Sequence, residues 1–420
     1  MKLLINTITI VFIMYGTVSA LTTMDNSYES YKSWCQHHGK IEDSERFAIW
    51  QENFKLVEQH NAKYNAGTST FYLSMKTQHA DLTNKEYKIF LLKSKSRGKN
   101  NAHFTFTAEQ ISSTSSDIPQ NWSWVEQGVI SPIKNQGQCG SCWAFSATAA
   151  MEGEFNRRNN GSLPSTCISK CGKMNNTCCS FSNQEVADCT RGGADTCNIG
   201  GEPHDGILFV ARTNKGQINT DEQYPYSSGT SGKLTKCTPQ TSNAITTGVT
   251  GYANVTSGDE EALKQAAYKY ATISVGIDAS SFLFQLYAGG IYNDDKCKNT
   301  PKALNHGVSI VGYGVGTPKP VGPPGPKPGP ANCENNHYKP SCQGEKGCDW
   351  CTDKSGFGWC QNTACSSKMM DVSSPKKKPT EYYIVKNSWG IDWGMNGYIA
   401  MSRNANNQCG IATDAVFALF

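Results

Sequence analysis

The segment at positions 136–145, which reads QGQCGSCWAF, constrains this chain more than any other. Its second cysteine, Cys142, opens a stretch of small and apolar residues that continues to Phe155 and is typical of a helix. Unpaired N–H groups at a helix N-terminus favour an anion, so we expect the Cys142 thiol to ionise more easily than a free one. Taken alone, a cysteine in a chain with 18 cysteines is better explained as half of a disulfide.

Two later segments overturn the disulfide interpretation. Residues 305–314 read NHGVSIVGYG, in which His306 opens a strand-like apolar run. Residues 382–390 read YYIVKNSWG, in which a second short strand ends at Asn387. The segment around Cys142 resembles the C-G-[SA]-C-[WY] signature of the papain family of cysteine proteases. The order Cys, His, Asn resembles that family's nucleophile, base and orienting residue.

The resemblance implies a role for each residue of the set. Cys142 would attack the scissile carbonyl, and His306 would shuttle the proton. Asn387 would orient the ring of His306, and Trp389 would shield their hydrogen bond from water. Gln136 and the backbone N–H of Cys142 would hold the oxyanion. This chemistry uses no metal ion and no cofactor.

A substrate cleft is also implied by the resemblance. Gly200 and Gly201 resemble the glycine pair along which substrate backbone lies, although Ile199 is an extra residue before them. The second-subsite pocket would be walled by Pro203, Gly276, Ile277, Gly307 and Asp414, with the two glycines leaving it roomy. Asp414 would either pair with a basic substrate side chain or point to solvent, which leaves a pocket for Leu, Val or Phe. No pair of histidines follows Gly201, which favours an endopeptidase over a dipeptide-trimming enzyme.

The fold implied by the resemblance is α+β. A mainly helical lobe would hold Cys142, a lobe built around an antiparallel β-barrel would hold His306 and Asn387, and the active-site cleft would lie between them. A helical propeptide would precede both lobes.

The N-terminus indicates a secreted protein. Lys2 precedes an apolar run to Tyr15 and a small-residue end at Ala20, which predicts a signal peptide over residues 1–20. The many cysteines fit the oxidising secretory route, and sequons at Asn121, Asn160, Asn175 and Asn254 are compatible with a glycoprotein. We find no second long apolar segment and therefore expect no membrane span. A net charge of +4 without an arginine-rich stripe excludes an obvious nucleic-acid surface.

Residues 21–117 form the expected inhibitory propeptide. Between Glu42 and Asn61, the residues Phe47, Trp50, Phe54 and Val57 recur at helical spacing. The series Glu42, Arg46, Trp50, Asn53, Val57 and Asn61 resembles the interrupted motif of the papain-family propeptide. A second propeptide motif is reduced to Asp81, and the polar stretch from Lys93 to Ser116 is interpreted as a linker.

Residues 118–420 form the expected peptidase domain, which carries two cysteine-rich insertions. One covers about 164–181 with four cysteines, and the other covers about 317–380 with six and a proline-rich opening. In a secreted chain, disulfides are favoured over a zinc site at Cys348 and Cys351. The resemblance implies three further pairs: Cys139 with Cys197, Cys189 with Cys237, and Cys297 with Cys409.

These features predict a cysteine-type endopeptidase that is made as an inactive precursor and acts on protein or peptide substrates, with its own propeptide as inhibitor. We expect a monomer in the secretory pathway, in a lysosome-like vacuole or outside the cell. The alternative is an adhesion or binding protein that uses the cysteine-rich insertion on a protease scaffold.

Overall fold

The computed structural model of the protein describes residues 27–95, 105–107, 118–159, 162–172, 176–190, 196–240, 242–319, 349–352, 358–361 and 381–420. The chain forms two compact units. The first comprises Met1–Glu58, Ala80–Leu82 and Pro326–Ser373, and the second comprises Gln59–His79, Thr83–Gly325 and Ser374–Phe420. The predicted signal peptide, the sequons at Asn160 and Asn175, and most of the second insertion lie outside the described residues.

The first unit is built on aromatic packing between two helices. Residues 27–38 are helical, and Tyr31 from this helix lies 5.2 Å from Phe47 and 6.0 Å from Trp50 of helix α2 (Ser44–Asn65), measured between ring centroids. Asn53 donates to the carbonyls of Ala80 and Leu82 at 2.8 and 2.9 Å. The helix predicted from the spacing of apolar residues is confirmed, and it extends to Asn65. Strands β12 (Asp349–Thr352) and β13 (Gly358–Gln361) pair antiparallel.

Asp81 of the reduced propeptide motif also has a partner in this unit. Its carboxylate lies 2.5 Å from Nζ of Lys40, and its side chain is largely buried. A buried carboxylate needs such a partner, which accounts for the retention of this one residue of the motif.

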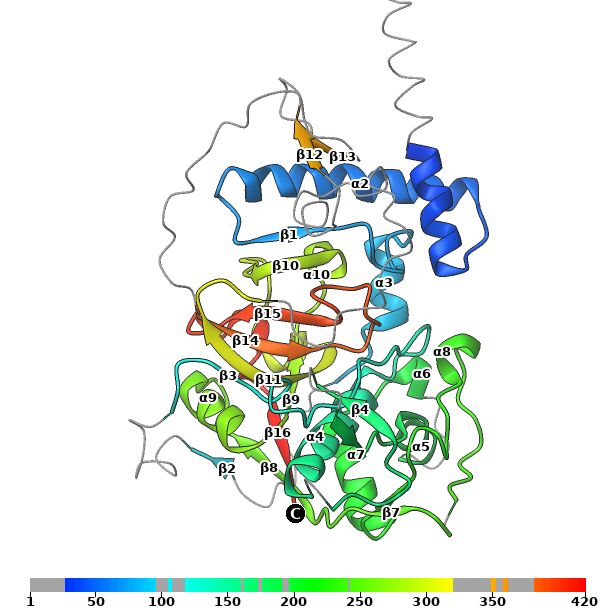
Figure 1. Ribbon diagram of the computed structural model, residues 1–420, viewed down its shortest axis with the longest axis vertical. Helices are drawn as coiled ribbons and strands as arrows, with labels where there is room; N and C mark the ends of the chain where they lie inside the picture. The colour runs from blue at the N-terminus through cyan, green and yellow to red at the C-terminus, as the bar shows by residue number, and fades with distance from the viewer. Residues whose placement is uncertain are drawn as a thin grey trace, which may run out of the picture. The chain divides into compact units, whose positions relative to one another are not determined.

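A long sheet organises the second unit (Figure 1). Its strands follow the order β1-β10-β15-β14-β11-β9-β16-β8-β2, and β3 pairs with β11. Their bounds are β1 Phe71–Leu73, β2 Thr105–Phe106, β3 Trp122–Ser123, β8 Gly251–Val255, β9 Ile273–Ile277, β10 Tyr287–Tyr292, β11 His306–Val315, β14 Glu381–Lys386, β15 Tyr398–Ser402 and β16 Ala415–Leu419. The central strands β9, β11, β14 and β15 pair antiparallel and are almost fully buried, as their apolar sequences require.

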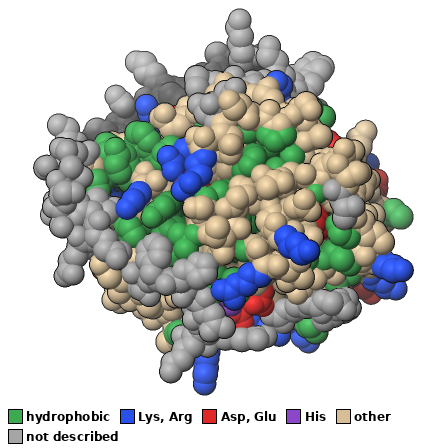
Figure 2. Space-filling model, turned by 90° about the horizontal axis from the view of Figure 1, so that it is seen from below, with side chains coloured by type: hydrophobic (Ala, Val, Ile, Leu, Met, Phe, Trp, Pro, Cys, Tyr) green, Lys and Arg blue, Asp and Glu red, His purple; other side chains and the backbone are tan. Residues whose placement is uncertain are grey.

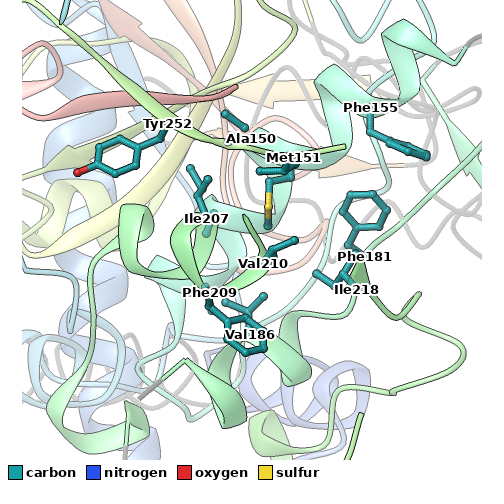
Figure 3. Packing of buried hydrophobic residues seen from close by; sticks show 14 of the residues in the cluster. Ala150, Met151, Phe155, Phe181, Val186, Ile207, Phe209, Val210, Ile218 and Tyr252 are labelled. Atoms are coloured by element: carbon teal, nitrogen blue, oxygen red, sulfur yellow. The ribbon is translucent and has the colours of Figure 1, made fainter. Parts of the chain in front are cut away.

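Helices surround a separate apolar core in the same unit. They are α3 (Asn84–Leu91), α4 (Cys142–Arg158), α5 (Asn183–Cys189), α6 (Thr196–Ile199), α7 (Pro203–Leu208), α8 (Ser228–Ser231), α9 (Glu260–Lys269) and α10 (Phe282–Gln285), with a π-helical turn at Phe209–Thr213 and short 3₁₀ turns at Pro301–Ala303 and Gln408–Gly410. Met151 of α4 faces Val210, and Phe155 faces Phe181 across this core (Figure 3). Helix α4 also packs against β11 and β9, so it is buried along nearly its whole length.

The first cysteine-rich insertion is a small hairpin. Strands β4 (Ser169–Cys171) and β5 (Asn176–Cys178) pair antiparallel, and disulfides join Cys171 to Cys178 and Cys167 to Cys179. A second short hairpin is formed by β6 (Gln217–Ile218) and β7 (Ile245–Thr246). Disulfides also join Cys139 to Cys197, Cys189 to Cys237, and Cys297 to Cys409.

The stretch from Lys93 to Ser116 is not a plain linker, contrary to the sequence prediction. Residues 105 and 106 form β2, which runs parallel to β8, and Phe106 is buried with its ring 5.9 Å from that of Phe417. One aromatic side chain with a place in the core is enough to fix a strand in an otherwise polar stretch.

Two findings concern the surface. No helix in the described part of the chain is both long and apolar enough to cross a membrane. On the face shown in Figure 2, Lys and Arg side chains lie in separate places among hydrophobic and uncharged polar side chains.

Gly290 allows β1 of the propeptide to lie against β10, and its replacement tests that contact. Gly290 has a φ of +82°, and a Cβ there would lie 2.4 Å from the carbonyl oxygen of Thr70. Gly258 has a φ of +80° with nothing within 4 Å of its Cβ position. We expect Gly258→Ala to cost about 1–2 kcal/mol of stability from the backbone alone. Gly290→Ala should cost about 1–3 kcal/mol more because β1 must shift. Urea unfolding of the full-length protein measures both, and equal losses would contradict the contact.

Candidate active site

Cys142 is the first residue of α4 and is fully buried. Ser141, which precedes it, makes no side-chain cap of the helix. The N–H groups of the first turn therefore stay available to a group that develops negative charge beside Cys142. The small residues that follow let α4 lie tightly against the sheet.

His306 and Asn387 meet because their strands are neighbours. His306 begins β11, and Asn387 directly follows β14, which pairs antiparallel with β11 so that Ser309 lies opposite Lys386. Nε2 of His306 lies 2.8 Å from Oδ1 of Asn387. Nδ1 of His306 is buried and has no hydrogen-bond partner among the described residues, which leaves it to exchange a proton with a reacting group.

Gly307 brings His306 to Cys142. A Cβ on Gly307 would lie 3.3 Å from the carbonyl oxygen of Cys142 and 3.2 Å from Cα of Trp143. A side chain at this position would crowd the first turn of α4, so glycine favours the close approach of β11. The imidazole and the thiol therefore come from two elements in direct backbone contact.

Trp389 and Gln136 lie beside the hydrogen-bonded pair of His306 and Asn387. The ring of Trp389 stacks on His306 with centroids 4.6 Å apart and an interplanar angle of 26°. Oε1 of Gln136 accepts from Oγ of Ser388 at 2.7 Å and from Nε1 of Trp389 at 3.1 Å. These bonds fix the side-chain amide, and its Nε2 donates to the carbonyls of Leu91 and Cys139 at 3.2 and 3.1 Å.

Residues 91–95 lie across this site, which the sequence did not predict. The N–H of Ser94 donates to the carbonyl of Asn305 at 3.0 Å, and the N–H of Lys95 donates to that of Gly201 at 3.0 Å. Ser94 and Gly201 form a parallel bridge. A Cβ on Gly200, where φ is +70°, would lie 1.6 Å from the carbonyl oxygen of Lys93. Backbone–backbone bonds of this kind leave no side-chain pattern in the sequence.

The covered site disfavours charge on both reacting groups. Burial raises the pKa of Cys142, although hydrogen bonds from the backbone at Gly307, Lys93, Ser94 and Trp143 oppose the shift. Burial also lowers the pKa of His306 to about 4, against the raising effect of its bond with Asn387. The expectation that Cys142 ionises easily is therefore wrong for the covered site, because desolvation outweighs the helix N-terminus.

The predicted pocket residues gather at one end of β9 and β11. Gly276 and Ile277 on β9 lie opposite Gly307 and His306. The N–H of Gly276 donates to the carbonyl of Asp414 at 3.0 Å. The pocket is narrower than expected at Gly276, because a Cβ there would lie 3.2 Å from Cδ1 of Leu304. Pro203 begins α7 and is buried.

Glu202, which precedes Pro203, is a buried acidic residue. Glu202 is 1% exposed and lies 3.1 Å from Nε2 of His204, whose ring stacks on Tyr252 at 5.3 Å. Burial raises the pKa of Tyr252, and the charges of Asp205, Asp414 and Glu202 raise it further. Tyr252 therefore lies close to these carboxylates. No motif marks Tyr252, His204 or Leu304 in the sequence.

Comparisons with known proteins agree with this geometry. Residues 118–321 and 357–419 match the family described as "Papain family cysteine protease", and residues 31–87 match "Cathepsin propeptide inhibitor domain (I29)". The chain is 30% identical over 417 residues to human cathepsin L2, covering 96% of each chain. It is 31% identical over 395 residues to digestive cysteine proteinase 1 of Homarus americanus, covering 92% of this chain and 94% of the relative. Among solved structures, digestive procathepsin L 3 from the larval midgut of Tenebrio molitor aligns with a TM-score of 0.65 and 25% identity, covering 94% of this chain and 99% of that one.

Uncovering the site should restore thiol reactivity. In the full-length protein, the raised pKa of Cys142 keeps it a thiol, and a His306 pKa of about 4 keeps the imidazole neutral above that pH. We expect iodoacetamide to alkylate Cys142 roughly 100-fold more slowly at pH 6 in the full-length protein than after cleavage before Ile118. The measurement uses a Cys35→Ser background, because Cys35 is the other free thiol of the described chain. Similar rates in the two forms would contradict the effect of the cover.

Proposed function

Because the chain belongs to the papain family of cysteine proteases, we propose that Cys142 is the nucleophile of peptide-bond hydrolysis and His306 its proton shuttle. The observation that carries the proposal is the His306–Asn387 bond of 2.8 Å, held beside the first turn of α4 by Gly307. The protein is a cathepsin L-like cysteine protease made as a proenzyme with an inhibitor domain. The comparisons give no support to the alternative of an adhesion protein.

The first half of the reaction forms a thioester. The Cys142 thiol passes its proton to Nδ1 of His306, and the thiolate adds to the scissile carbonyl. The carbonyl oxygen becomes an oxyanion that accepts from Nε2 of Gln136 and the backbone N–H of Cys142. When the C–N bond breaks, the imidazolium protonates the leaving amine. The acyl group remains on Cys142.

The second half regenerates the enzyme. His306 takes a proton from a water molecule, which attacks the thioester carbonyl and forms a second oxyanion in the same site. The C–S bond then breaks, and the proton returns to the sulfur. Asn387 keeps the ring of His306 in the orientation that both halves need, and Trp389 keeps solvent from that bond.

Residues 91–95 support an assignment of how the precursor is held inactive. They use the groups that the reaction needs, since Leu91 accepts from the Gln136 amide and Lys95 donates to Gly201. We assign residues 1–20 to a signal peptide, 21–117 to the propeptide, and 118–420 to the peptidase with insertions at about 164–181 and 317–380. The same assignment gives a monomer in the secretory pathway, in a lysosome-like vacuole or outside the cell.

The pocket around Asp414 supports an endopeptidase that accepts basic as well as apolar side chains at the second position before the cleaved bond. Cβ of Asp414 lies 3.9 Å from the position that a Cβ on Gly276 would take, which places Asp414 beside β9. A Lys or Arg stem could lie along Ile277 and Leu304 while its charge meets Asp414.

Removing the Cys142 thiol should abolish the activity. We expect Cys142→Ala to reduce turnover by about 10⁴-fold or more, because both halves of the reaction pass through the sulfur. Self-processing near Ile118 should also stop. Cys35→Ser, which removes the other free thiol of the described residues, should keep wild-type turnover. Substantial hydrolysis by purified Cys142→Ala would refute the assignment.

Removing Asp414 tests substrate choice. We expect Asp414→Ala to lower kcat/KM for a peptide with Arg at the second position by about 10-fold, as for the loss of a charge-assisted contact. The same change should leave the corresponding Leu peptide within about two-fold. If the Arg-to-Leu ratio is the same in both enzymes, Asp414 points to solvent and does not contact the substrate.

A further inference from the structure

Four charged side chains, two of them buried and two partly exposed, form a cluster that the reaction does not use. Nζ of Lys134 lies 2.8 Å from Glu152 and 2.7 Å from Asp221. Glu152 belongs to α4 and is 1% exposed. The fourth charge, on Lys386 at the end of β14, is 7% exposed and reaches the cluster from the sheet.

Lys386 and Glu152 are joined through a hydroxyl group. Nζ of Lys386 donates to Oγ of Ser131 at 2.8 Å, and Ser131 in turn donates to Oε2 of Glu152 by a short hydrogen bond. Oε1 of Glu152 accepts from Lys134 at 2.8 Å and from the N–H of Phe181 at 2.6 Å. The strand that carries Lys386 is therefore fixed to α4 by a continuous chain of hydrogen bonds.

The charges depend on one another. Burial by itself would raise the pKa of Glu152, but Lys134 and Lys386 together lower it below its ordinary value. Burial lowers the pKa of Lys386 to about 8, while the charges of Glu152 and Asp221 oppose the shift and that of Lys134 adds to it. Without the Lys386 ammonium, two carboxylates would face one cation in a buried site, and such imbalance is relieved by movement or by water entry.

This cluster lies next to the reacting groups. One cavity is lined by residues of α4, β11 and the end of β14, and Glu152, Lys386, Gly307 and Asn387 are all among them. Glu152 lies ten residues beyond Cys142 on the same rigid helix. Lys386 is the residue immediately before Asn387.

Asn387 depends on its backbone for its orientation. Its Oδ1 accepts from the N–H of Ser388 at 2.8 Å and contacts His306, but its Nδ2 has no hydrogen-bond partner among the described residues. The side-chain amide therefore follows the backbone of residues 386–388. Lys386 is not among the causes of the lowered pKa of His306, which are burial and the Asn387 bond. An influence of Lys386 on the reaction has to be positional.

We propose that Lys386 is a positioning residue, which through Ser131 and Glu152 holds Asn387 and β14 in register with α4 and so keeps His306 aligned with Cys142. The inference rests on the proposed role of Asn387. A displacement on the order of 1 Å between reacting groups can cost about 100-fold in rate. Substrate binding is set elsewhere, so kcat should respond and KM should not.

Lys386→Met tests the proposal because it keeps the length of the side chain and removes the charge. In the processed enzyme we expect kcat to fall about 10- to 100-fold, with KM within about two-fold. Arg403→Met is the matched control, since Arg403 is also a buried cation of the sheet and pairs with Glu381 at 2.8 Å. It should lower the melting temperature and leave kcat unchanged. A Lys386→Met enzyme with wild-type kcat and a loss of melting temperature like that of Arg403→Met would overturn the proposal.

Two further variants keep the test decisive. Combining Lys386→Met with Asn387→Ala should lower kcat no further than Asn387→Ala alone, because both changes act on one alignment; fully multiplicative losses would count against it. If Asn387→Ala itself keeps wild-type kcat, the proposed role of Asn387 fails and this inference fails with it. If Lys386→Met does not fold, Ser131→Ala provides the test of the proposal instead. It breaks the hydroxyl link while keeping every charge, and an unchanged kcat in that variant would also overturn the proposal.

Discussion

The contact between Gly307 and the first turn of α4 is the constraint on which the site depends. A Cβ at Gly307 would lie 3.3 Å from the carbonyl oxygen of Cys142, so a side chain there would crowd the first turn of the helix and glycine favours the close approach. His306 begins that strand and Cys142 begins that helix. Asn387 then follows from the pairing of β14 with β11, and Gln136 follows from its bond to Ser388. One close approach thus assembles groups from four separate parts of the chain.

The pKa values of the reacting pair, Cys142 and His306, respond to burial differently from those of the charged cluster around Glu152. Beneath residues 91–95, Cys142 and His306 are buried without a counter-charge from outside the pair, and both shift toward their neutral forms. In the cluster around Glu152, opposite charges outweigh burial, so the pKa of Glu152 is lowered and that of Lys134 is raised. Residues 91–95 therefore block the site by desolvating it as well as by filling it, and removing this cover changes the chemistry as well as the access.

The sequence predicted the reacting groups because each lies in a short segment whose composition is itself constrained. Cys142, His306 and Asn387 could be named from their neighbours, and the propeptide helix from the spacing of Trp50 and Val57. The pocket walls were harder to predict, because Leu304 lies in an ordinary segment and its contact with Gly276 depends on the pairing of β9 with β11. Residues 93–95 were mistaken for a linker, since a segment held by its backbone can have almost any side chains.

Lys386 and Glu152 illustrate a further signal in the sequence, which is a charged residue next to an apolar run. Lys386 ends the strand EYYIVK after an apolar run, and Glu152 lies within the helix CWAFSATAAMEGEFNRR, directly after an apolar and small-residue run. A charge at a buried position is costly unless an opposite charge lies near it. A buried lysine and a buried glutamate are therefore expected to lie close together. Their pairing through Ser131 obeys that rule. Lys134, which is only partly buried, contacts both Glu152 and Asp221 and completes the cluster at the junction of helix and sheet.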